Sequence, residues 1–123
     1  MNVWFVIAGI NGTLAVAFGA FAAHGLQGRI DAHALSVFET GARYHMYHAL
    51  AIGLAAFAIR DAAAAPATAA AGFFLAGILL FSGSLYLLAL TGTKLLGIIT
   101  PVGGVCFLAG WGLLAFAATR LKM

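Results

Sequence analysis

The residues best suited to chemistry in this chain are its histidines, and three of them fall close to the ends of apolar stretches. His24 ends the first such stretch, while His45 and His48 open the second, so we expect the three at one level of the molecule. His45 and His48 are three residues apart and share a helical face, with Tyr44 and Tyr47 beside them. Imidazole can bind a metal or haem, and His and Tyr side chains can hydrogen-bond a quinone head group.

A structural role for this cluster is favoured over ligand binding. His and Tyr at a membrane interface commonly anchor helices and hydrogen-bond helix ends. His33 lies in the segment between, together with Asp31 and Glu39, which adds carboxylates at the same level. We predict no metal, no cofactor and no catalytic residue; a ligand site, if present, would use His24 and His48 first.

Three further polar residues lie inside apolar stretches. Asn11 is a lone carboxamide, which in hydrocarbon should find a hydrogen-bond partner on another helix, such as a hydroxyl of the third span. Ser82 and Ser84 flank Gly83, an arrangement that resembles an activated nucleophile. No acidic residue that could orient a histidine base lies in any apolar stretch, so we interpret both serines as buried polar residues of helix contacts.

Charge is scarce, and its placement indicates the elements that must hold these residues. Only 7% of the 123 residues are charged and 64% are hydrophobic, with a mean hydropathy of +1.09. A hydrocarbon core about 30 Å thick needs roughly 20 apolar helical residues. The sequence therefore predicts an all-α integral membrane protein of one domain. Its few basic residues are interfacial anchors, so nucleic-acid binding is excluded, and the single Cys106 excludes an internal disulfide.

We predict four transmembrane helices, at about residues 3–23, 45–59, 68–90 and 100–119. Residues 29–44 carry apolar side chains on one face and charged ones on the other, which predicts a short interfacial amphipathic helix between the first two spans. Thr100 and Pro101 have the pattern of an N-cap followed by a first-turn proline.

Small residues recur along three of the spans. In lipid, such residues let neighbouring helices approach closely. We expect the helix contacts to use Gly12, Gly19, Gly83, Gly103 and Gly110. Orientation stays open, because three basic residues are expected on each side of the membrane.

Four segments resemble the YgdD-like family of small inner-membrane proteins, which has organellar relatives and is classed as a domain of unknown function. These segments are residues 18–26 (FGAFAAHGL), 44–50 (YHMYHAL), 81–92 (FSGSLYLLALTG) and 100–111 (TPVGGVCFLAGW). The resemblance covers nearly the whole chain and implies a four-helix protein of the bacterial plasma membrane. Two residues depart from the family pattern: His45 replaces the usual Gln and Ala22 the usual Gly.

The leading functional hypothesis is a non-catalytic accessory or scaffold subunit in the lipid bilayer, packed against a larger membrane complex or against itself as a homo-oligomer. The alternative is quinone, haem, metal or lipid binding at the His/Tyr cluster. A small-solute transporter is a weaker alternative, because all three acidic residues are predicted outside the spans.

Overall fold

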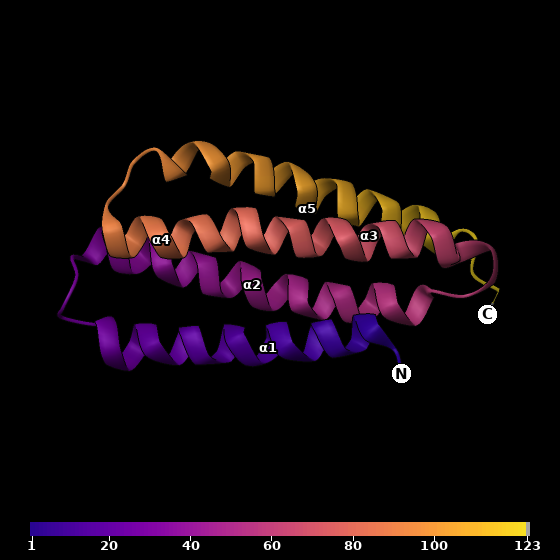
Figure 1. Cartoon of the computed structure of the whole chain (residues 1–123), viewed down its shortest axis with the longest axis horizontal. Coiled ribbons are helices and arrows are strands. Elements are labelled where there is room, and N and C mark those ends of the chain that lie inside the picture. Colours follow the sequence, from indigo (N-terminus) through magenta and orange to yellow (C-terminus); the bar gives the residue numbers. More distant parts are fainter. Residues whose placement is uncertain (123) are drawn as a thin grey trace.

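The computed structural model describes residues 1–122 as an antiparallel bundle of α-helices joined by short turns (Figure 1). The main helices are α1 (Val3–Phe21), α2 (Ala32–Ala58), α3 (Ala64–Gly77), α4 (Gly83–Thr91) and α5 (Leu96–Ala118). A π-helical turn, Ala22–Leu26, extends α1, a 3-10 turn, Asp61–Ala63, precedes α3, and a second π-helical turn, Ile78–Ser82, joins α3 to α4. Both chain ends lie at the same end of the bundle, so the turns before α2 and after α4 share the opposite end (Figure 1).

α2 is one continuous helix, where the sequence analysis expects an interfacial helix followed by a separate span. Asp31 caps its start, since its Oδ1 accepts the amide of Ala34 at 2.7 Å. The apolar face of the expected interfacial helix is instead a packing face of the bundle. Phe38 on this face is buried against Phe18 and Tyr86, so its helix continues into the span without a break.

α3 and α4 form one long rod that contains the third predicted span. α5 begins at Leu96, so Pro101 lies inside the helix and Thr100 is no N-cap. The Thr100 hydroxyl is used elsewhere, because it lies 2.6 Å from the Ser84 hydroxyl on α4. The predicted cap is therefore a contact between helices.

The helices lie side by side in chain order, with α2 between α1 and the α3–α4 rod and α5 on the far side of that rod (Figure 1). Among the helices, α1 packs substantially against α2 alone, apart from its own π-helical extension. The largest buried cluster joins α2, α3 and α5 around Phe74, Ile52 and Phe107.

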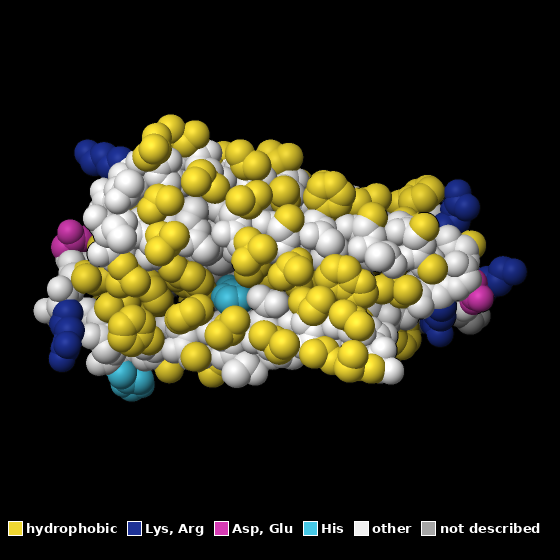
Figure 2. Space-filling view, viewed as in Figure 1, with side chains coloured by type: hydrophobic (Ala, Val, Ile, Leu, Met, Phe, Trp, Pro, Cys, Tyr) yellow, Lys and Arg dark blue, Asp and Glu magenta, His cyan; other side chains and the backbone are white. Residues whose placement is uncertain are grey.

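Within residues 1–122, three helical segments are long and apolar enough to cross a membrane: Val3–Leu26, Asp61–Thr91 and Leu96–Ala118. On the face that Figure 2 shows, hydrophobic side chains run along the bundle, and Lys, Arg, Asp and Glu side chains lie at its two ends. α2 has the length of a span, with 27 residues, yet carries more polar side chains than the others. The all-α membrane fold is confirmed, with three candidate spans and a fourth long helix packed among them.

Candidate functional site

The structure separates the histidines that the sequence analysis groups together. His45 and His48 lie near the middle of α2 and are only 3% and 4% exposed. His24 is exposed in the π-helical turn at the end of α1, and His33 is exposed in the first turn of α2. Because α2 begins 13 residues before His45, this histidine and His48 lie inside the bundle and away from the helix ends.

His45 is the centre of a buried hydrogen-bonded chain across three helices. Its Nε2 lies 2.9 Å from Asn11 Oδ1 on α1, and its Nδ1 lies 2.9 Å from the Tyr86 hydroxyl on α4. Asn11 Nδ2 in turn donates to the Ile7 carbonyl at 2.9 Å. The Asn11 carboxamide thus has the expected partner on another helix, but this partner is an imidazole on α2 and not a hydroxyl of the third span.

The hydrogen-bond partners of His45 determine which of its two ring nitrogens carries the proton. Since Asn11 Nδ2 donates to a carbonyl, Asn11 presents Oδ1, an acceptor, to the imidazole. His45 therefore donates from Nε2. Its Nδ1, in the neutral ring, accepts from the Tyr86 hydroxyl. Both ring nitrogens are occupied, so His45 offers no lone pair to a metal.

His48 is held in the opposite tautomer on another side of α2. Its Nδ1 donates to the Tyr44 carbonyl at 2.7 Å, and its Nε2 accepts from Trp111 Nε1 on α5 at 3.1 Å. The imidazole also stacks on the Phe107 ring, with centroids 3.5 Å apart and planes 7° from parallel. His48 therefore bridges α2 and α5 as a neutral ring with no free nitrogen.

Three of the predicted ligand residues, Tyr44, Tyr47 and His48, line one lateral groove. This aromatic groove has a volume of about 380 Å³ and lies between α2, α5 and the π-helical turn before α4. Its remaining walls are Phe81, Gly104, Phe107, Leu108 and Trp111. No hydrogen bond joins the hydroxyl of Tyr44 or Tyr47 to another group within residues 1–122, and both side chains are substantially exposed. His24 and His45 are not part of this groove.

The two serines have different surroundings. The Ser84 hydroxyl is bonded to the Phe81 carbonyl at 2.9 Å and to Thr100 on α5. Ser82 lies in the π-helical turn and is fully buried, and its Oγ has no hydrogen-bond partner in the described chain. Within residues 1–122 neither serine hydroxyl is hydrogen-bonded to a histidine.

The predicted packing glycines fall into two groups. A Cβ at Gly103 would come within 3 Å of the backbone of Leu80 and Phe81, and one at Gly110 would overlap the Phe74 ring. At Gly12 and Gly19 a Cβ would meet nothing within 4 Å, and at Gly83 it would make only ordinary contact. The contact between the α3–α4 rod and α5 therefore depends on glycine, whereas the glycines of α1 border open space.

The chemistry available in this core is hydrogen bonding between helices. Within residues 1–122 no three His, Cys, Asp or Glu side chains gather to hold a metal ion. Nothing in the sequence pattern indicates that Tyr86 and Trp111 are the partners of the two buried histidines. Glu39 and Arg43, predicted to lie at the membrane interface, form a 3.9 Å ion pair on the middle part of α2.

Comparison with known proteins identifies the family. Residues 18–104 match the family described as protein of unknown function (DUF423), so the chain belongs to it. It is 46% identical over 121 residues to the UPF0382 membrane protein YwdK of Bacillus subtilis and 43% identical over 122 residues to a UPF0382 membrane protein of Haemophilus influenzae. These alignments cover 98% of this chain in both cases, and 98% and 97% of the relatives. No solved structure matches the chain.

The family resemblance and the membrane location predicted from sequence are thereby confirmed. The relatives are bacterial proteins named as membrane proteins, and this chain has three apolar helices able to span a bilayer.

Proposed function

We propose that this protein is a non-catalytic membrane subunit that assembles side by side with a second copy of itself through the groove between α1 and α2. In this arrangement α2 crosses the bilayer with the other helices, because it is packed between α1 and the α3–α4 rod and must share their depth. Some of the polar side chains that lower the hydropathy of α2 form hydrogen bonds inside the bundle, among them His45 and His48.

The observation that carries the proposal is the ion pair of Glu39 and Arg43. Arg43 is the twelfth of the 27 residues of α2, so its Cα lies about 3 Å along the axis from the helix midpoint. The side chains of Arg43 and Glu39 are 53% and 45% exposed. Charged groups at this depth are costly against lipid and normally face protein or a water-filled cavity. A protein partner would cover them.

The groove around this pair suits a close approach of helices. It has a volume of about 420 Å³. Its lining is mainly small residues of α1, the π-helical turn after it and α2, namely Ala15, Gly19, Ala22, Ala23 and Ala42, together with Met46. Open space at Gly12 and Gly19 leaves the backbone of α1 accessible. Small residues at an interface allow van der Waals packing between membrane helices, which drives their association.

A second copy is the occupant with matching charge. In a twofold dimer each residue meets the symmetry-related surface of the partner. Arg43 of one copy can then pair with Glu39 of the other, and the reciprocal pair forms by symmetry. In these two pairs each glutamate would neutralise an arginine of the other copy, inside the bilayer where an unpaired charge is energetically costly.

Charge exchange tests this arrangement. Glu39→Lys should disrupt self-association because it leaves two cations facing two cations, while the double variant Glu39→Arg, Arg43→Glu should restore it. The mass of the purified protein in nanodiscs, measured by native mass spectrometry, reports the oligomer. A lone monomer from native membranes under mild conditions would overturn the proposal, and a stoichiometric complex with a larger subunit would replace the second copy with that subunit.

Gly19→Leu offers an independent test, since a leucine there would fill the groove. Ala17→Leu is the matched control, because residue 17 is exposed on the opposite side of α1. Self-association should fall with Gly19→Leu and persist with Ala17→Leu. Equal behaviour of the two variants would exclude the groove as the interface.

The aromatic groove favours a second candidate function, binding of a lipid-soluble quinone. The hydroxyls of Tyr44 and Tyr47 are the available hydrogen-bond donors, because both nitrogens of His48 are occupied. Extraction and mass spectrometry of the purified protein should then recover quinone from the wild type and less from Tyr44→Phe, Tyr47→Phe. Equal recovery from both proteins would eliminate this candidate.

A further inference from the structure

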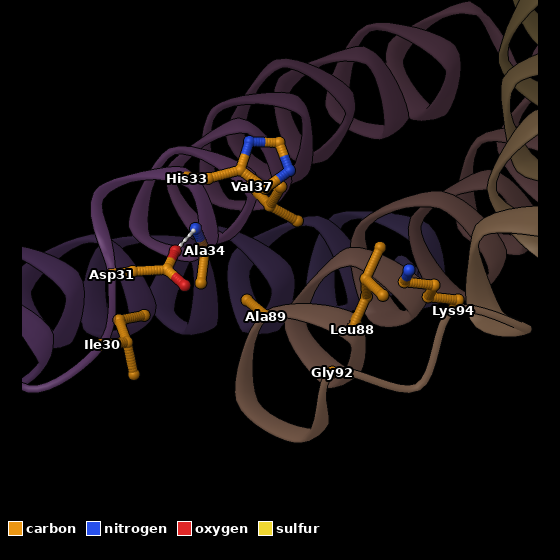
Figure 3. Close-up of a pocket in the computed structure, with 9 residues that line it drawn as sticks. All are labelled: Ile30, Asp31, His33, Ala34, Val37, Leu88, Ala89, Gly92 and Lys94. Carbon is orange, nitrogen blue, oxygen red and sulfur yellow. Dashed lines mark hydrogen bonds between the residues drawn. The ribbon is translucent and has the colours of Figure 1, made fainter.

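A separate pocket lies at one end of the bundle, away from the buried histidines. It has a volume of about 570 Å³ and lies between the first turns of α2 and the end of α4. Figure 3 shows Asp31 and Lys94 at opposite ends of this pocket, with Ala34, Ala89 and Leu88 between them. The turns before α2 and after α4 both lie at this end of the bundle (Figure 1).

The α4 end of the pocket is shaped by Gly92. This residue terminates α4 in the left-handed region, with φ of 70°, and its amide donates to the Leu88 carbonyl at 2.8 Å. The chain then turns so that Lys94, two residues later, lines the same pocket as Leu88 and Ala89. The cation is thus placed over an apolar wall by the helix cap.

Opposite charges line the pocket without forming an ion pair with each other. Within residues 1–122 no ion pair joins Lys94 or Asp31 to another side chain. Asp31 uses Oδ1 to cap α2, which leaves Oδ2 as an acceptor. His33 adds a ring with two nitrogens on the same lining.

We propose that this pocket binds the head group of a zwitterionic phospholipid, phosphatidylethanolamine, from the adjacent leaflet. The phosphate would lie beside Lys94 and His33, and the ammonium would donate to Asp31. Ile30, Val37 and Leu88 supply an apolar surface for the glycerol and the start of the acyl chains.

Charge balance distinguishes this lipid from an anionic one. Lys94 and Asp31 sum to zero, which matches a head group that carries one positive and one negative charge. The phosphate of phosphatidylglycerol would pair with the Lys94 ammonium, but this lipid has no cation for the Asp31 carboxylate. The pocket volume lies in the range of ligand sites, about 300–1,000 Å³. The location fits as well, because charged side chains on the face in Figure 2 lie at the two ends of the bundle, where head groups would lie.

The test is competitive lipid binding to the full chain in detergent, read by native mass spectrometry with equimolar phosphatidylethanolamine and phosphatidylglycerol. The wild type should retain phosphatidylethanolamine in preference by about threefold or more. Asp31→Asn is the key variant, because Asn caps a helix as well as Asp while removing the charge. It should abolish the preference, and Lys94→Gln should weaken the retention of both lipids.

Lys122→Gln is the matched control, since it removes a lysine from the opposite end of the bundle and should change nothing. Circular dichroism of each variant checks that the helices remain. Equal retention of the two lipids by the wild type, or an unchanged preference in Asp31→Asn, would overturn the proposal. Displacement of the lipid by millimolar inorganic phosphate would overturn it too, because the site would then be one for a soluble anion.

Discussion

The contact between the α3–α4 rod and α5 and the contact between α1 and α2 both contain many small residues, yet they use them differently. At the first contact Gly103 lies directly against the backbone of Leu80 and Phe81, and Gly110 accommodates the Phe74 ring. At the second contact Gly12 and Gly19 border open space, and a groove remains between the helices. The contact between the α3–α4 rod and α5 is therefore tightly packed, and we call it the closed contact. The contact between α1 and α2 leaves a groove at the surface, and we call it the open contact.

This difference shows that a row of small residues has two uses in a membrane protein. It permits a close helix crossing inside the chain, or it leaves a surface that another helix can approach. The distinguishing feature here is the exposed Glu39–Arg43 pair, which accompanies only the open contact. The following substitutions test the contrast between the two contacts.

Gly103→Ala should have the largest effect on stability. Its Cβ would overlap backbone atoms that cannot move as a side-chain end could, so we expect the free energy of unfolding to fall by about 2–3 kcal/mol. Gly12→Ala, the matched control at the open contact, should change it by less than about 0.5 kcal/mol. Unfolding by SDS titration in mixed micelles measures both. Equal losses would contradict the contrast between the contacts.

His45→Phe should have the next largest effect, because α1 is joined to α2 and α4 through this residue. The substitution leaves Asn11 Oδ1 and the Tyr86 hydroxyl without partners, which should cost about 1–2 kcal/mol. Adding Asn11→Leu should recover part of the loss, since it removes one of the unpaired groups. If the changes in unfolding free energy caused by the two substitutions simply added in the same titration, the hydrogen-bonded chain would be refuted.

Trp111→Phe removes the donor to His48 Nε2 on the closed side of the bundle. We expect a loss of about 0.6–1 kcal/mol, typical of hydrogen bonds between membrane helices. Nitrogen NMR of the imidazole should show Nδ1 protonated in the wild type and a shifted Nε2 resonance in the variant. Trp4→Phe is the control, because the Trp4 side chain makes no hydrogen bond within residues 1–122. A shift of the His48 resonances in that variant would argue against the assignment.

Ser82→Ala should have the smallest effect. The Ser82 hydroxyl is buried without a partner, so its removal should leave the free energy of unfolding unchanged within about 0.5 kcal/mol or raise it. Ser84→Ala is the comparison, since it removes the bond to Thr100 and should cost about 0.6 kcal/mol. A larger loss from Ser82→Ala than from Ser84→Ala would show that Ser82 has a partner.

Much of the fold followed from hydropathy alone. Long apolar runs predicted membrane helices, and the apolar segments Val3–Leu26, Asp61–Thr91 and Leu96–Ala118 contain or closely match three of the predicted spans. The start of α2 was harder to predict, because the apolar face of residues 29–44 resembles one that lies on a membrane surface. Only the positions of Phe18 and Tyr86 reveal that this face packs against protein.

The site was less predictable than the fold. Asn11 was expected to hydrogen-bond across helices because an amide in hydrocarbon needs a partner, but nothing in the sequence specified His45 as that partner. His24 and His48 lie in neighbouring motifs and still end in different environments. Their separation follows from the continuity of α2, which a pattern of residue types does not reveal.

The amino-acid sequence by itself determined that this protein is helical, apolar and embedded in a membrane, because those properties depend on how many charges the chain carries and how far apart they are. Tertiary structure alone decided which polar groups meet. The tautomers of His45 and His48, the closed contact at Gly103 and the open groove beside Arg43 all depend on the register between helices. That register is set by packing between segments distant in the chain, and local residue patterns carry no information about it.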